Sequence, residues 1–189
     1  MTSTIVSGRR VWLRLLQPGD GDLILRFYRR LSSETIYRRF LSFVQLPNEG
    51  LLKRLLDVDH CEREAIIALD DDGIAGVARY GTGRDESHEV AVVVADDWQG
   101  RGLGKVLMRR LAHIARLRGI DSFHATMLGD NMRAQSLVRG LSPRVTIRFE
   151  AGYLEADIPL RLFGWPGSDR RSNVVSGSRK VPRGSAPVR

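Results

Sequence analysis

The stretch from Val90 to Gly119 constrains the fold of this chain more than any other part of the sequence. It begins with an apolar, β-branched run at 90–94, which is typical of a buried strand. A glycine-rich turn follows at 99–104, and beyond it the apolar residues recur every three or four positions up to Gly119. That spacing predicts an amphipathic helix that ends at Gly119. The segment therefore predicts a strand, a glycine turn and a helix in succession.

The glycine turn predicts a site for an anion. Its alternating glycines let the backbone approach a ligand closely, and the first turn of the helix leaves N–H groups without intrahelical partners. Such a site suits a pyrophosphate. A P-loop is excluded, because Gln99 replaces its first glycine and Lys105 precedes Val106 rather than Ser or Thr. The dinucleotide-binding fingerprint is excluded because Lys105 also replaces its third glycine.

The turn resembles the acyl-CoA signature of the GNAT superfamily of N-acetyltransferases, which reads (Gln/Arg)-x-x-Gly-x-(Gly/Ala). The segment Gln99-Gly100-Arg101-Gly102-Leu103-Gly104 matches this signature at every defined position. A structural turn would explain the glycines alone, whereas the flanking strand and helix agree with the signature as well. The resemblance implies an α/β (α+β) GNAT fold, with a mixed central sheet of about six to seven strands and helices on both faces.

Hydrophobic periodicity along the rest of the chain agrees with this fold. We interpret residues 1–10 as an N-terminal extension, 11–163 as the acetyltransferase domain and 164–189 as a basic tail. Strands are predicted at 11–15, 65–69, 74–80, 88–94, 121–128, 145–150 and 153–160, and helices near 22–31, 34–41, 49–56, 103–118 and 132–139.

Three segments carry a closer resemblance, to the acetyltransferase domain of bacterial protein lysine acetyltransferases. They are residues 30–40, residues 76–80, and Glu89 ahead of the valines at 92–94. The resemblance implies that the acceptor is a protein lysine, for example on an acyl-CoA synthetase. Such relatives often carry an additional regulatory or synthetase-like domain, which we do not expect in this chain.

Charge is unevenly distributed along the chain. Residues 164–189 hold six of the 30 Lys and Arg residues and one of the 22 acidic residues, so most of the net charge of +8 lies there. This segment is poor in apolar residues, and we expect it to be disordered. We expect no nucleic-acid partner for the domain, although the tail could attract acidic protein or nucleic acid by charge alone.

The composition also indicates the cellular compartment in which we expect the protein. No run of about 18 apolar residues is present, and residues 1–10 lack the apolar core of a signal peptide. The single cysteine, Cys61, excludes an internal disulfide and fits a reducing compartment. We therefore expect a cytoplasmic protein with no membrane partner, either a monomer or a homodimer.

The resemblance implies a binding mode for acetyl-CoA. The pantetheine arm would run along the backbone of Val92, Val93 and Val94 like an added strand, with a backbone N–H facing the thioester oxygen. The pyrophosphate would meet the N–H groups of residues 100–105.

Three side chains beside this path have two interpretations each. Arg101 and Lys105 would add positive charge to the pyrophosphate site, or they are ordinary surface charge. Asn131 matches an asparagine that contacts the cofactor in many relatives, and it equally suits a helix cap.

Acylation of an amine requires a base, because a lysine amine has a pKa of about 10.4 and arrives as an ammonium ion. Glu89 is the candidate, since it directly precedes the predicted buried strand. Apolar surroundings would raise the pKa of its carboxylate and make it a better base. The related lysine acetyltransferases use a Glu at the matching position. The alternative is an exposed glutamate at a strand end.

Val138 departs from the family pattern. Many relatives place a Tyr there that protonates the departing thiolate, and Ser136 is not obviously placed to substitute. A thiol with a pKa of about 8.5 is a tolerable leaving group without help. We expect no metal, because His60, His88, His113 and His124 lack ligand spacing.

Two arginines, Arg38 and Arg39, could line the acceptor side of the site. We favour the simpler interpretation that they are helix-surface charge.

Together these features predict an acetyl-CoA-dependent N-acetyltransferase that transfers an acetyl group directly to a primary amine, most simply a protein lysine. A small-molecule amine is the alternative acceptor. A non-catalytic acyl-CoA sensor is a second alternative, which Val138 would permit. Nucleic-acid binding through the basic tail is a third.

Overall fold

A computed structural model describes residues 1–42, 47–83 and 87–160 of the chain. The predicted tail at 164–189 and the end of the predicted domain at 161–163 lie outside the described residues. The elements of the described part are β1 (Thr2–Val6), β2 (Arg9–Leu15), α1 (Gly21–Arg29), α2 (Ser33–Phe40), α3 (Glu49–Leu56), β3 (Glu64–Asp70), β4 (Gly73–Thr82), β5 (His88–Val94), the short 3₁₀ helix η1 (Asp96–Trp98), α4 (Leu103–Leu117), β6 (Ser122–Leu128), α5 (Met132–Arg139), β7 (Thr146–Glu150) and β8 (Tyr153–Pro159).

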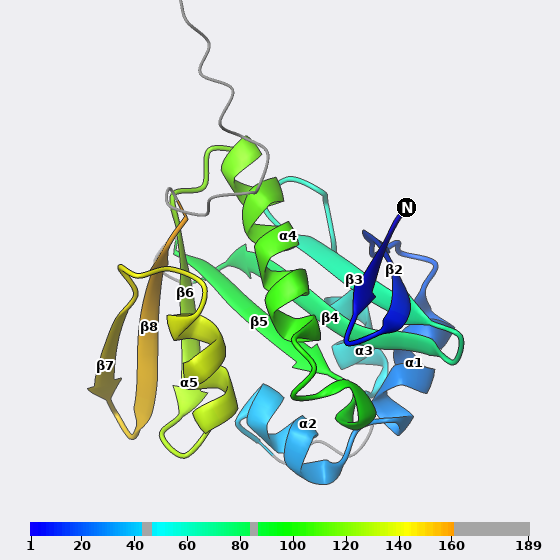
Figure 1. Cartoon of the computed structure of the whole chain (residues 1–189), viewed down its shortest axis with the longest axis horizontal. Helices are drawn as coiled ribbons and strands as arrows, with labels where there is room; N and C mark the ends of the chain where they lie inside the picture. Colours follow the sequence, from blue (N-terminus) through cyan, green and yellow to red (C-terminus); the bar gives the residue numbers. More distant parts are fainter. Residues whose placement is uncertain (43–46, 84–86, 161–189) are drawn as a thin grey trace, which may run out of the picture.

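The strands form one mixed sheet in the order β1-β2-β3-β4-β5-β6-β8-β7 (Figure 1). All neighbouring strands are antiparallel except β5 and β6, which are parallel. The predicted mixed sheet is therefore confirmed. It has eight strands in the described part of the chain, one more than the upper end of the prediction.

The eighth strand is β1, which lies within the predicted N-terminal extension. Its backbone pairs with β2 from Thr2 opposite Leu13 to Val6 opposite Arg9. Ser7 and Gly8 both adopt positive φ, at 47° and 77°, which is the geometry of a tight two-residue hairpin turn. The hairpin extends the edge of the sheet, so the residues of β1 in the predicted extension are part of the sheet.

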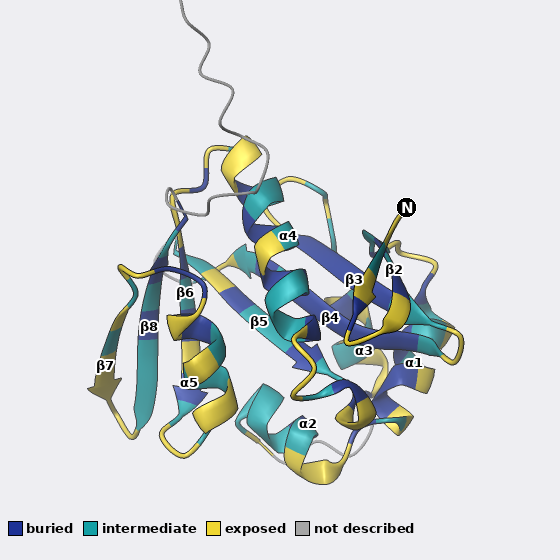
Figure 2. Cartoon of the chain, viewed as in Figure 1, coloured by how far each residue is buried: buried dark blue, intermediate teal, exposed yellow. Residues whose placement is uncertain are grey.

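Helices cover both faces of the sheet, as predicted. Alternation along β4 shows which face meets which helix, since successive side chains point to opposite sides. A Cβ on Gly76 would lie 2.9 Å from a methyl carbon of Leu107, so this side of β4 lies against α4. The next residue, Val77, shares a small cavity with Ile24 and Phe27 of α1 on the other side. Figure 2 shows β3, β4 and the inner side of α4 as the buried centre of the molecule.

The turn that follows β5 is anchored by Trp98, which is fully buried. Its indole Nε1 donates a 2.6 Å hydrogen bond to Asp70, and the guanidinium of Arg9 lies 4.1 Å from the ring centroid. Arg30 forms a bidentate ion pair with the same carboxylate, at 3.0 and 2.9 Å. Burial acts to raise the pKa of Asp70, but the hydrogen bonds from Arg30 and Trp98 outweigh it and lower that pKa. These contacts hold the glycine turn at a defined place beside the sheet.

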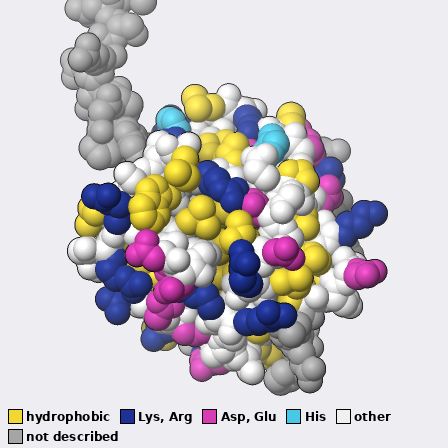
Figure 3. Space-filling view, turned by 90° about the vertical axis from the view of Figure 1, so that its right-hand side faces the viewer, with side chains coloured by type: hydrophobic (Ala, Val, Ile, Leu, Met, Phe, Trp, Pro, Cys, Tyr) yellow, Lys and Arg dark blue, Asp and Glu magenta, His cyan; other side chains and the backbone are white. Residues whose placement is uncertain are grey.

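No helix within the described residues is long and apolar enough to cross a bilayer. On the face shown in Figure 3, the Lys and Arg side chains are interspersed with acidic side chains and do not form one basic patch. The prediction that most of the surplus positive charge lies in residues 164–189 rests on the sequence, because those residues lie outside the described part of the chain.

Candidate active site

The parallel strands β5 and β6 are joined at one register pair in the described structure, Glu89 opposite His124. Past this pair the two strands diverge toward their carboxyl ends (Figure 1). From Val92 to Val94, β5 is paired with β4 on one side, while β6 is paired with β8 along its whole length. The backbone edge of β5 that faces β6 is therefore available to a ligand over these residues.

A cavity of about 910 Å³ lies where the strands diverge. This volume is typical of a site for a large cofactor. Ten of the twelve residues predicted above for the site line this cavity, and Glu89 and Arg101 do not. The ten are Val92, Val93, Val94, Gln99, Gly100, Gly102, Leu103, Gly104, Lys105 and Asn131.

The glycine turn adopts a conformation that only glycine reaches without strain. Gly100 and Gly102 have φ values of 72° and 89°, in the left-handed region. Gly102 directly precedes α4, and a Cβ built there would meet nothing within 4 Å. The space above this residue is thus open, and the first N–H groups of α4 point toward it. This arrangement can hold an anionic group against the backbone.

Gln99 connects the turn to its surroundings through its side-chain amide. The Nε2 group donates to the carbonyl of Val94 at 3.1 Å and to the hydroxyl of Thr35 at 2.9 Å, and its Oε1 accepts from Arg133. The predicted site residue therefore fixes the end of β5 relative to α2 and α5. In this structure its polar atoms are used within the protein.

The two cations of the signature differ in placement. Lys105 lines the cavity, and no carboxylate lies within ion-pair distance of it in the described part of the chain. Arg101 lies outside the cavity lining, because its Nε donates a 2.8 Å hydrogen bond to the carbonyl of Asp97. Lys105 is therefore the better placed of the two to meet a pyrophosphate.

Asn131 satisfies both interpretations offered by the sequence. Its side-chain oxygen accepts a 3.1 Å hydrogen bond from the N–H of Ala134 and so caps α5. The same residue lines the cavity, and its side-chain amide group remains available there.

On α5, Val138 is buried in the core, whereas Ser136 faces the cavity. The position at which many relatives carry an acid is therefore occupied here by a packing residue. The serine is the hydroxyl on this helix that lines the site.

Glu89 is the second residue of β5 and lies on the side of the strand that also carries Ala91 and Val93. Its side chain is exposed, and a Cβ built on Gly83 would lie 3.1 Å from its Oε1. The sequence predicted that apolar surroundings would bury the Glu89 carboxylate, and the structure does not show that burial. His88 lies on the other side of the strand, with its ring against Tyr80 and its Nε2 4.0 Å from Glu62.

The α2 helix is tied to the turn after β5 through Asp96. The carboxylate accepts from the Ser32 N–H at 2.6 Å, the Ser32 hydroxyl at 3.0 Å and the Thr35 hydroxyl at 2.7 Å. Burial acts to raise the pKa of Asp96, but the hydrogen bonds from Thr35 and Ser32 outweigh it, so that the pKa lies below its ordinary value. These contacts bring α2 to one wall of the cavity.

Sequence reasoning missed most of this wall. Arg38 and Arg39 line the cavity, although the sequence favoured their interpretation as surface charge. Arg38 pairs with Glu34 at 2.9 Å and with Asp130 at 3.3 Å, so it bridges α2 and the turn before α5. The signal available in the sequence was the resemblance of residues 30–40, which does not identify the side chains that face the site.

Comparison with known proteins agrees with this geometry. The family model described as "Acetyltransferase (GNAT) family" matches residues 26–141, from within α1 to just past the end of α5. Acetyltransferase Pat of Mycolicibacterium smegmatis is 34% identical over 160 residues, which cover 81% of this chain and 47% of Pat. The chain thus spans about half the length of that relative.

Two further relatives extend the comparison. Acetyltransferase PA5475 of Pseudomonas aeruginosa is 36% identical over 135 residues, covering 69% of this chain and 73% of the relative. The crystal structure of the GNAT domain of S. lividans PAT superposes with a TM-score of 0.78 at 24% identity, covering 84% of this chain and 96% of that domain, and it supports the fold. The chain belongs to the acetyltransferase (GNAT) family, and this membership supports the predicted N-acetyltransferase activity.

Proposed function

We propose that this protein uses acetyl-CoA to acetylate a primary amine directly, and that the amine is a protein lysine. The observation that carries the proposal is the cavity beside the carboxyl end of β5, which combines a strand edge unpaired within the described residues with a glycine turn at a helix N-terminus. The β5 edge of the cavity suits the amide-rich pantetheine arm of acetyl-CoA, and the start of α4 suits its pyrophosphate.

In the proposed binding mode, the pantetheine amides pair with the backbone of Val92 and Val94. The pyrophosphate accepts hydrogen bonds from the N–H groups at the start of α4, and Lys105 supplies positive charge. A β5 backbone N–H that faces the gap donates to the thioester oxygen and stabilises the negative charge that develops there.

The transfer step forms one bond and breaks one. The amine nitrogen attacks the thioester carbonyl carbon, the C–S bond breaks, and CoA departs as a thiolate. Before the attack, Glu89 accepts one proton from the lysine ammonium, through a water molecule if it is not in direct contact, and the nitrogen loses a second proton to solvent as the amide forms. Solvent then protonates the thiolate, since Val138 is a core residue and a thiolate is a tolerable leaving group.

Similarity to the acetyltransferases named Pat and PAT supports a protein lysine as the acceptor. An acyl-CoA synthetase lysine is the first acceptor to test. The burial of Val138 favours one competing function, binding of acyl-CoA without turnover, because it removes the general acid of many relatives.

Calorimetric titration with acetyl-CoA tests the first half of the proposal without any assumption about the acceptor. We expect micromolar binding by the wild-type protein and by Glu89→Gln. Absence of binding up to millimolar acetyl-CoA would contradict the acetyltransferase proposal and leave only the fold.

Thiol release in the presence of a purified acyl-CoA synthetase or lysine peptides tests the second half. We expect Glu89→Gln to lower turnover by about a hundredfold to ten-thousandfold. Glu150→Gln, which alters an exposed glutamate of β7, is the matched control and should change neither binding nor turnover. If the wild-type protein binds acetyl-CoA but turns over none of the acceptors, the result supports the sensor instead.

A further inference from the structure

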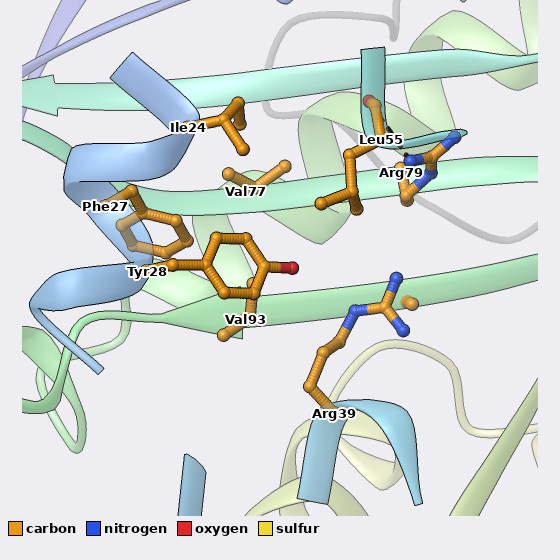
Figure 4. Close-up of a pocket in the computed structure, with 9 residues that line it drawn as sticks. Ile24, Phe27, Tyr28, Arg39, Leu55, Val77, Arg79 and Val93 are labelled. Atoms are coloured by element: carbon orange, nitrogen blue, oxygen red, sulfur yellow. Dashed lines mark hydrogen bonds between the residues drawn. The ribbon is translucent and has the colours of Figure 1, made fainter. Parts of the chain in front are cut away.

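A second, much smaller cavity lies beside the candidate active site, between α1, α2, α3 and the strands β4 and β5 (Figure 4). Its volume is about 20 Å³, which is room for one oxygen-sized group. Two arginines, Arg39 of α2 and Arg79 of β4, line it together with Tyr28. Figure 4 shows the phenol oxygen of Tyr28 on the side of the cavity where both guanidinium groups lie.

Neither guanidinium has a carboxylate within ion-pair distance among the described residues. Arg79 donates one 3.2 Å hydrogen bond to the carbonyl of Leu55, and Arg39 lies 4.9 Å from the ring centroid of Phe40. Both residues are partly buried. Asp57 attracts Arg79 electrostatically from beyond ion-pair distance, so the cavity contains two positive charges without a directly paired carboxylate among the described residues.

Three other half-buried arginines of this protein are each paired with a carboxylate. Arg14 pairs with Asp20 at 2.6 Å, Arg30 with Asp70 at 2.9 Å and Arg118 with Glu64 at 2.7 Å. The pKa of each of these three is raised, whereas burial lowers the pKa of Arg39 and burial together with the charge of Arg39 lowers that of Arg79. Two like charges at low dielectric destabilise each other unless an anion joins them.

The pair lies on the route to the thioester. Arg39 and Val93 line both cavities, so the small cavity adjoins the β5 edge of the large one. Arg79 stands opposite Ala91 in the sheet register, and Glu89 follows on the same side of β5, roughly 6.6 Å further along the strand. An acceptor amine that meets the thioester near Val93 and loses its proton toward Glu89 would therefore bring its neighbouring atoms to the arginine pair.

We propose that Arg39 and Arg79 form an acceptor subsite that binds a carboxylate carried close to the reactive amine. One carboxylate oxygen would occupy the cavity between the two guanidiniums, and the remaining N–H donors would orient the group. The inference rests on the N-acetyltransferase function proposed above. The carboxylate belongs to an acidic side chain near a target lysine, or to the acceptor itself if that is an amino acid.

A matched series of acceptors tests the subsite. Lysine peptides carry one glutamate at successive positions around the lysine, each with a glutamine counterpart, and free lysine is compared with lysinamide. We expect at least one acid peptide, or free lysine, to exceed its amide counterpart in kcat/KM by about tenfold to a hundredfold. A preference among the peptides would identify an acidic side chain near the target lysine as the source of the carboxylate. A preference for free lysine over lysinamide would identify the acceptor's own carboxylate.

Variants connect the preference to the pair. Arg39→Gln is the primary variant, because the Arg39 guanidinium makes no hydrogen bond within the described residues and its removal leaves no protein group unpaired there. We expect Arg39→Gln and Arg79→Gln to lose the acid preference while acetyl-CoA binding persists. Arg29→Gln removes an exposed arginine of α1 and should keep the preference. Equal use of acid and amide acceptors by the wild-type protein would overturn the proposal.

A measurement without turnover separates failure of the subsite from failure of the proposed function. Titration with acetate, against sodium chloride of equal ionic strength, should shift the NMR signals of the Arg39 and Arg79 Nε–H groups saturably in the millimolar range. Absence of a saturable shift would overturn the subsite even if the enzyme is active. Saturable shifts in a protein that acetylates no acceptor would contradict the acetyltransferase function alone.

Discussion

The hydroxyl of Thr35 donates a 2.7 Å hydrogen bond to the carboxylate of Asp96, and this contact joins α2 to the turn after β5. The same hydroxyl accepts from the side chain of Gln99, the first residue of the acyl-CoA signature. The wall that carries Arg38 and Arg39 is therefore connected to the glycine turn through hydrogen bonds between side chains. The acceptor side and the cofactor side of the cavity are thus positioned by the same hydrogen bonds.

The substitution Asp96→Ala should remove the hydrogen bonds that connect α2 to the turn after β5. The change leaves the N–H of Ser32 and the hydroxyls of Ser32 and Thr35 without their common acceptor, which we expect to cost about 1–3 kcal/mol in the free energy of unfolding. Urea denaturation measures this loss, and Asp71→Ala, in the exposed β3–β4 turn, is the control that should change it by less than about 0.5 kcal/mol. An Asp96→Ala protein as stable as the control would contradict the argument.

Gly102→Ala tests the open space above the glycine turn. The left-handed φ of 89° makes any side chain there cost about 1 kcal/mol, and its Cβ would occupy the predicted pyrophosphate position. Gly119→Ala, at φ 85° and with nothing within 4 Å, carries the same strain at the other end of α4. We expect similar losses of stability but weaker acetyl-CoA binding, by about tenfold or more, only in Gly102→Ala. Equal affinities in calorimetry would place the pyrophosphate elsewhere.

Gly76→Ala should disturb the packing of α4 on the sheet. Its Cβ would lie 2.9 Å from Leu107 Cδ1 and 3.2 Å from the carbonyl oxygen of Val93, so side chain or backbone must move, at a cost of about 1–3 kcal/mol. Gly104→Ala is the contrasting variant, since its Cβ meets ordinary contacts at 3.5 Å within a helix, and we expect a gain of about 0.5 kcal/mol. Thermal unfolding without ligand measures both, and a shift of the same sign in the two proteins would contradict the prediction.

Asp70 should contribute to the pH dependence of stability. Its pKa is lowered in the folded protein, so its contribution is fully present above the pKa of the unfolded state, about 3.9, and is lost as pH falls through the folded value. We expect Asp70→Asn to be less stable than wild type at neutral pH, by about 1–3 kcal/mol, because Arg30 and Trp98 lose a charged acceptor. The difference should shrink below pH ~4. A constant difference in melting temperature from neutral to acidic pH would show that ionisation of Asp70 is not its cause.

Much of the fold was predictable because its signals are local. The β-branched run at 90–94, the glycine turn and the helical periodicity after Leu103 identified β5, the turn and α4 from adjacent residues. The β1 strand was missed because Thr2–Val6 is mostly polar and Ile5 is 60% exposed, so no alternation of burial is visible in the sequence. Its hairpin turn at Ser7 and Gly8 was the one available signal.

The candidate site was predictable only where one segment forms it. The glycine turn and the edge of β5 follow from the signature, and they meet at one cavity. The arginine pair joins α2 to β4 across 40 residues of sequence, and no local spacing indicates that contact. Likewise, the exposure of Glu89 depends on how the chain around Gly83 and the start of β6 pack beside it, which a strand pattern does not determine.

The single register pair between Glu89 and His124 has a mechanical consequence. In the described residues, the far end of the gap has no backbone pairing between β5 and β6. Side chains connect the two sides there instead, because Gln99 accepts a hydrogen bond from Arg133 and Arg38 pairs with Asp130. The width of the gap beside Val92–Val94 therefore depends on side-chain contacts, so a substitution at one of these side chains changes that width without breaking a strand pair.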